Sequence, residues 1–148
     1  MFRGNHVHSI DVKGRVSLPA RFRELLLADG DGRFVLTPAL FDPCLHLHPM
    51  RPWVELEKKI AGLPRFDRHV ELFRRRYISP AVDCELDRAG RVLVPPSLRD
   101  RAALQGDVLW AGMGEAIELW SKAAWEAASE ISPADEEGLR RTMEKHGL

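Results

Sequence analysis

The stretch IDVKGRVSLP, residues 10–19, returns in nearly the same form as LDRAGRVLVP at residues 86–95. A shift of 76 residues places Asp11 on Asp87, and the same shift aligns the glycine, arginine, valine and proline of the two stretches. Apolar positions agree as well, so the chain contains two related halves, about residues 1–62 and 77–148. Each half alone would have a very small core, and we therefore predict a pseudo-symmetric pair that shares one core.

Each half is predicted to contain the same order of elements. Alternating polar and apolar residues indicate short strands on both sides of a tight turn at Gly14, where glycine tolerates a positive φ. Pro19 ends the second strand and can open a helix, which two more strand-like runs and a helix around residues 53–60 follow. The second half repeats this order and closes with a helix that begins near Ser121.

Two more helices are expected outside the repeats. A linker helix is predicted over residues 63–78, because one helical face would carry Phe66, Val70, Phe73 and Tyr77. Ser132 is a suitable N-cap for an exposed terminal helix with acidic residues in its first turn. The expected domains are a first repeat over 1–62, the linker helix over 63–78, a second repeat over 79–131 and a C-terminal helix over 132–148.

The composition indicates an ordinary globular protein. The 148 residues are 45% hydrophobic and carry no formal net charge. No apolar run approaches the roughly 18 residues that a membrane span needs, and the first residues lack the apolar segment of a secretion signal. We expect a cytoplasmic protein with two reduced cysteines. Charge is uneven: residues 1–26 hold five basic and two acidic side chains, whereas residues 126–148 hold three basic and six acidic ones.

The repeated Asp-x-x-x-Arg spacing places a carboxylate and a guanidinium across the turn of each hairpin. Asp11 can hold Arg15 in one orientation, and an oriented arginine can bind a phosphate or a guanine edge. A protruding β element with such a turn fits the major groove of DNA. The alternative is an ion pair that only stabilises the turn, although exposed pairs contribute roughly 0–1 kcal/mol.

The sequence resembles the MraZ family in several motifs that occur in the family's order. These are MFRG at the start, DVKGRVSLPARFRE, PCLHLHP, CELDRAGRVLVPPSLR and IELW. The resemblance implies an α+β fold, a pseudo-symmetric β barrel of two swapped-hairpin repeats of the AbrB type with flanking helices. It also implies a nucleoid-associated transcriptional regulator of the bacterial division and cell-wall gene cluster. Such a regulator binds direct repeats of double-stranded DNA in its own promoter as a ring-shaped homo-oligomer, without a cofactor.

The resemblance also implies the residues that contact DNA. Arg15 would make the main contact with Asp11 orienting it, and Asp87 and Arg91 are their counterparts. The first turn is favoured as the contact surface, because Ala89 stands where the first turn has Lys13. The full set expected at DNA is Arg3, Asp11, Lys13, Gly14, Arg15, Asp87, Arg88, Gly90 and Arg91.

Two other functions are compatible with parts of the sequence, and a third is not expected. Cys44, His46 and His48 alternate, so on a strand they would share one side and could bind zinc, although no fourth ligand is evident. A ring-forming scaffold that binds only proteins would not need Arg15. An enzyme is not expected, because the sequence contains no nucleophile motif and no phosphate-binding glycine loop.

Overall fold

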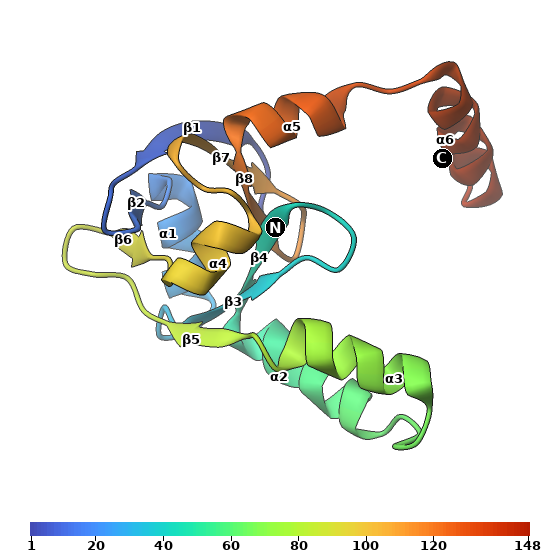
Figure 1. Cartoon of the computed structure of the whole chain (residues 1–148), viewed down its shortest axis with the longest axis horizontal. Helices are drawn as coiled ribbons and strands as arrows, with labels where there is room; N and C mark the ends of the chain where they lie inside the picture. Colours follow the sequence, from blue (N-terminus) through green and yellow to red (C-terminus); the bar gives the residue numbers. More distant parts are fainter.

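A computed structural model describes all 148 residues (Figure 1). The first half contains β1 (Asn5–Ile10), β2 (Arg15–Ser17), α1 (Ala20–Ala28), β3 (Phe34–Pro38), β4 (Cys44–Pro49) and α2 (Met50–Ala61). The linker consists of α3 (Arg68–Phe73) and the π-helical turn η1 (Arg74–Ile78). The second half contains β5 (Val82–Cys84), β6 (Arg91–Leu93), α4 (Pro96–Arg101), β7 (Gly106–Gly112), β8 (Ile117–Ser121) and α5 (Lys122–Ser129), and α6 (Pro133–Lys145) ends the chain.

The two halves exchange strands. A six-stranded sheet has the order β1-β7-β8-β4-β3-β5, so the first strand of each half pairs with the third strand of the other half. β4 and β8 join the halves in the middle of this sheet, and β2 and β6 form a separate antiparallel ribbon. The expected mixed α+β class is confirmed. The strand pairing describes an open sheet and a ribbon, and no ladder closes them into the expected barrel.

The strand register follows the sequence repeat. In the ribbon Val16 lies opposite Val92, and the flanking pairs obey the same shift of 76 residues. In the sheet His46 lies opposite Glu118. A pseudo-twofold axis therefore passes through both pairs, and the two halves are related across it.

The strands on the two sides of the first turn do not pair with each other as a simple hairpin. β1 and β2 flank the turn as predicted, but β1 forms its ladder with β7, and β2 forms its ladder with β6. The physical reason is that a two-stranded hairpin is at best marginally stable alone. Pairing with the other half places β1 in the six-stranded sheet and lets the β2–β6 ribbon pack on the shared core.

One hydrophobic core fills the space between the sheet, the ribbon and the first helix of each half. It contains 19 buried residues from both halves, among them Val16, Val92, Phe22 and Leu98. Trp110 is fully buried on β7, and its indole Nε1 donates a hydrogen bond to the Ser17 carbonyl at 2.9 Å. The β2–β6 ribbon therefore packs on the sheet through the common core.

The linker helix begins later than predicted. Phe66 is 90% exposed and lies ahead of the helix, because Asp67 caps α3 by accepting hydrogen bonds from the backbone of His69 and Val70. The predicted helical face is therefore wrong at Phe66. Tyr77 is buried and packs with Trp53 of α2.

Two helical segments project from the body of the molecule. Figure 1 shows α2 beside α3 as one arm, and α5 with α6 as another. The predicted terminal helix is confirmed, with Ser132 and Asp135 forming a capping box ahead of its first turn. No helix has the length and apolar character of a membrane span.

Gly14 provides a test of the strand exchange, since it lies in the first turn with φ at +89°. A Cβ atom at this position would come within 2.6 Å of the Val94 carbonyl oxygen in the other half. We expect Gly14→Ala to lower the free energy of unfolding by about 1–3 kcal/mol, because both the backbone conformation and the close approach are incompatible with a side chain. Chemical denaturation of the purified protein measures this change.

Gly138→Ala is the matched control. Gly138 lies in α6 with open space around its Cβ position, so this change should stabilise the protein or leave it unchanged. Equal free energies of unfolding for Gly14→Ala and the unaltered protein would contradict the described turn.

Candidate nucleic-acid interface

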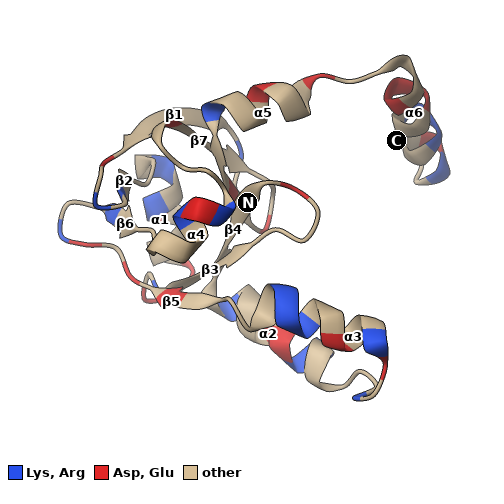
Figure 2. Ribbon diagram, viewed as in Figure 1, with Lys and Arg blue, Asp and Glu red and all other residues tan.

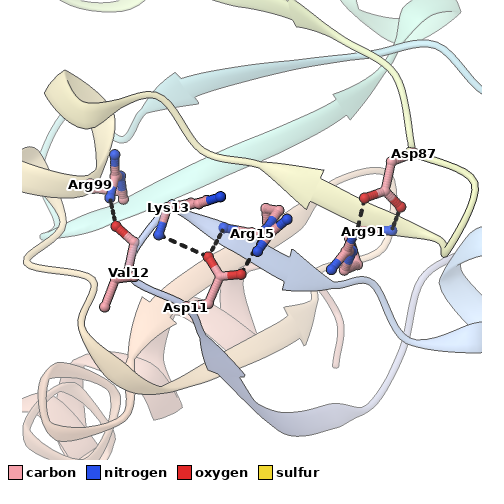
Figure 3. A network of polar contacts seen from close by, with 7 residues as sticks. All are labelled: Asp11, Val12, Lys13, Arg15, Asp87, Arg91 and Arg99. Atoms are coloured by element: carbon pink, nitrogen blue, oxygen red, sulfur yellow. Dashed lines mark hydrogen bonds and ion pairs between the residues drawn. The ribbon is translucent and has the colours of Figure 1, made fainter.

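The first turn holds Asp11 and Arg15 in a fixed arrangement (Figure 3). One carboxylate oxygen of Asp11 accepts hydrogen bonds from the backbone N–H of Lys13 at 3.0 Å and of Arg15 at 2.9 Å. The other oxygen accepts the Nε–H of Arg15 at 2.7 Å. Only Nε of the guanidinium donates to the carboxylate, so the two terminal nitrogens of Arg15 remain available as donors.

The second turn repeats this arrangement. Asp87 accepts the backbone N–H groups of Ala89 and Arg91 at 2.9 Å each, and it accepts the Nε–H of Arg91 at 2.8 Å. The two arginine side chains are similarly exposed, at 37% for Arg15 and 36% for Arg91. The two turns therefore offer equivalent, oriented guanidinium groups to solvent.

The ribbon brings the two arginines onto one outward face. Val16 and Val92 point into the core, so the alternate residues of β2 and β6 point outward. Arg15 lies opposite Leu93, which makes Arg91 its diagonal neighbour at a typical distance of about 7–8 Å between Cα atoms. The strands are antiparallel, and the two turns consequently lie at opposite ends of the ribbon.

Each turn is supported by an arginine from the other half. Arg99 of α4 donates through Nη1 to the Val12 carbonyl at 3.1 Å, and its side chain lies against Gly14. Arg23 of α1 also lies against Gly90, whose added Cβ would be 2.8 Å from Arg23 Cδ, while Arg23 Nη1 donates to the Leu18 carbonyl of its own half at 2.6 Å.

Main-chain hydrogen bonds cross in the same manner. The Val94 N–H donates to the Gly14 carbonyl at 2.8 Å, and the Leu18 N–H donates to the Gly90 carbonyl at 3.1 Å. The position of each turn is thus determined by residues of both halves.

The electrostatics keep both turn carboxylates ionised. Hydrogen bonds from the backbone N–H of Arg15, with its side chain and charge, lower the pKa of Asp11 below its usual value of 3.8. Arg91 lowers the pKa of Asp87 for the same reason. Each carboxylate therefore neutralises its arginine partially and holds it in place at neutral pH.

Additional cations lie beside these pairs. Lys13 is exposed at the tip of the first turn, and Arg88 is exposed in the second. Figure 2 shows basic residues on β6 and on the loop that precedes it, whereas the projecting α6 carries both signs of charge. Val12 beside Lys13 is 96% exposed, an apolar side chain with no contact that would bury it.

The structure gathers most, but not all, of the predicted site residues. Asp11, Lys13, Gly14 and Arg15 form the first turn, and Asp87, Arg88, Gly90 and Arg91 form the second. Arg3 lies beyond the other end of β1, eight residues from Asp11, which is about 26 Å along an extended chain. Arg3 is therefore separated from the first turn, and its contact with DNA remains a prediction.

Sequence reasoning did not assign a role to Arg23 and Arg99. The shift of 76 residues aligns them, and this alignment was the available signal. Their support of the opposite turn depends on the strand exchange, which no local pattern indicates.

Comparisons with known proteins agree with the repeat. The family described as "MraZ protein, putative antitoxin-like" matches residues 1–76 and again residues 77–143. The chain is 40% identical to the transcriptional regulator MraZ of Nitrosococcus oceani over 142 residues, which cover 95% of both chains. It is 41% identical to the protein of the same name from Moorella thermoacetica over 143 residues, which cover 97% of this chain and 96% of the relative.

A third relative, the transcriptional regulator MraZ of Halothermothrix orenii, is 39% identical over 148 residues and covers the full length of both chains. The family matches almost the whole chain and divides it into the same two halves that exchange strands in the structure. The chain therefore belongs to the MraZ family of transcriptional regulators.

Proposed function

We propose that this protein regulates transcription by placing the β2–β6 ribbon and its two turns in a groove of double-stranded DNA. The observation that carries the proposal is the pair of oriented arginines, Arg15 and Arg91, on one outward face. A two-stranded ribbon fits the major groove, where an arginine fork can pair with a guanine edge. A fixed guanidinium loses less entropy on binding than a free one.

The two turns would have related but unequal roles. Arg15 and Arg91 are held alike, so both would reach the DNA. Lys13 at the first tip has no counterpart at Ala89, whereas Arg88 adds a cation to the second turn. Arg15 would read bases with Asp11 orienting it, and Lys13 and Arg88 would contact phosphates.

The family resemblance supports the finer parts of the proposal. The repeats would be AbrB-type swapped hairpins over residues 1–62 and 79–131, with a linker helix over 63–78 and a C-terminal helix over 132–148. The regulator would be a cytoplasmic, nucleoid-associated ring of identical chains on direct repeats upstream of the division and cell-wall genes. In such a ring several weak contacts act together, and avidity can exceed the affinity of one site by roughly 10²–10⁴. No enzymatic step forms part of this function.

Binding to DNA from upstream of the protein's own gene tests the proposal. We expect Arg15→Ala and Arg91→Ala each to lose about 1–3 kcal/mol per contact, or roughly 5- to 150-fold in affinity, since each removes an oriented fork. Lys13→Ala should weaken binding to all sequences alike and reduce the salt dependence of binding. Fluorescence anisotropy over a salt series, with scrambled DNA as competitor, measures both effects.

Arg140→Ala is the matched control for loss of one positive charge, because Arg140 lies on the exposed α6. Full affinity in both Arg15→Ala and Arg91→Ala would show that the turns serve assembly rather than DNA recognition. A loss in Arg15→Ala alone would restrict the contact to the first turn.

The orientation of the arginines can be tested by titration. We expect the carboxyl pKa of Asp11 and of Asp87 to lie below 3.8. Because these values are lowered on folding, the stabilisation is fully present above pH 3.8 and is lost as the pH falls through the folded value. Carbon NMR of labelled carboxyl groups measures the two pKa values.

Each turn is the control for the other in this titration. Arg15→Ala should raise the pKa of Asp11 toward 3.8 and leave that of Asp87 unchanged. A pKa of Asp11 at or above 3.8 in the unaltered protein would contradict the geometry of the turn.

A further inference from the structure

A cluster of metal-binding groups lies on the opposite face of the sheet from the core and the ribbon. Cys44 and His46 come from β4, and Glu118 comes from β8. One ligand atom from each of the three lies within 4.8 Å of the other two. The alternation of β4 explains this placement, because Leu45 and Leu47 occupy the core face.

The distances in the cluster are those between ligands that share one ion. His46 Nε2 lies 3.2 Å from Glu118 Oε2, and Cys44 Sγ lies 3.7 Å from the same oxygen. With Zn–N and Zn–O near 2.0–2.1 Å and Zn–S near 2.3 Å, tetrahedral geometry places N and O about 3.4 Å apart and S and O about 3.6 Å apart. Two of the three ligand pairs thus already lie near these spacings, and Cys44 Sγ and His46 Nε2 lie within 4.8 Å of each other.

A second layer of hydrogen bonds holds the imidazole of His46. Its Nδ1 lies 2.7 Å from the Tyr77 hydroxyl, and that hydroxyl also lies 2.7 Å from His48 Nε2. His48 Nε2 can accept a hydrogen bond from this hydroxyl, whose oxygen is then able to accept one from His46. His46 can then donate from Nδ1 to Tyr77 and present the lone pair of Nε2 to a metal ion.

We propose that Cys44, His46 and Glu118 form a site for a divalent transition-metal ion, with Zn²⁺ as the best match and water as the fourth ligand. One thiolate, one imidazole and one carboxylate are ligand types that zinc accepts in four-coordinate sites. The His46 and Glu118 side chains retain 26% and 12% exposure, so solvent reaches the cluster. Binding releases the thiol proton of Cys44 to solvent.

The predicted ligand set is corrected in one member. Cys44, His46 and His48 do share one side of the strand, but His48 Nε2 is engaged by Tyr77 rather than directed at the other two. Glu118 takes its place from the neighbouring strand. His48 instead supports His46 through the shared hydroxyl.

The position of the site gives the ion a structural consequence. His46 and Glu118 face each other across the pseudo-twofold axis, so the two halves supply different ligands at equivalent positions. An ion there would clamp β4 to β8 and thereby join the halves. Without an ion, His46 Nε2 and Glu118 Oε2 form a hydrogen bond with each other at 3.2 Å.

Cobalt titration of the untagged, chelator-treated protein tests the site, because Co²⁺ bound to thiolate gives an intense near-ultraviolet charge-transfer band. We expect the band to saturate at one Co²⁺ per chain and to disappear when Zn²⁺ is added. Cys84→Ser should behave as the unaltered protein, since Cys84 lies on β5 outside the cluster. Cys44→Ser should lose the band.

Two more variants distinguish a metal ligand from a residue that only orients a ligand. Glu118→Gln should weaken Zn²⁺ binding at least tenfold in equilibrium dialysis, and Tyr77→Phe should weaken it by roughly 10- to 100-fold through the imidazole. Circular dichroism shows which variants fold. If Cys44→Ser does not fold, the metal affinity of Glu118→Gln tests the site instead. The absence of a saturable band in the unaltered protein, or a band that survives in folded Glu118→Gln at full affinity, would overturn the proposal.

Discussion

The exchange of strands between the two halves is the interaction on which the rest of the structure depends. β1 pairs with β7 of the second half, and β5 pairs with β3 of the first half. The shared core follows directly, because the ribbon and the first helix of each half close over a sheet that both halves build. Neither half has a complete set of neighbours for its own strands.

The same exchange explains how short turns can hold arginines in defined orientations. The carboxylate of Asp11 orders its turn locally, but exposed ion pairs contribute little stability, so the turn needs further support. That support comes from the other half, through the Val94 N–H and the Arg99 side chain. Both turns are supported in this way, and two equivalent guanidinium groups result. Under the proposed function, this fixed geometry would add to the affinity for DNA.

Local signals in the sequence predicted the repeat, the glycine turns, the starts of α1, α4, α5 and α6, and the Asp–Arg pairs. These features depend on residues that are close in the chain, as the hydrogen bonds of Asp11 and the cap at Ser132 illustrate. The partners of β1 and β5 could not be predicted in this way, because strand pairing is decided by side-chain packing between distant segments. The membership of Glu118 in the metal-binding cluster could not be predicted for the same reason, because Glu118 lies on β8 and the other two ligands lie on β4. At Phe66 a local signal was misleading. The apolar periodicity of the linker includes this residue, but Asp67 caps the helix after it.

Separating the two halves tests whether the strand exchange holds the protein together. The chain can be divided after Ser79, an exposed residue between η1 and β5, into fragments 1–79 and 80–148. Sedimentation and amide NMR of each fragment and of an equimolar mixture would then report folding and stoichiometry. If the exchanged strands hold the protein together, neither fragment should form a folded monomer, and the mixture should yield a folded one-to-one complex. A fragment that folds alone as a monomer would contradict the claim that the exchanged strands hold this protein together.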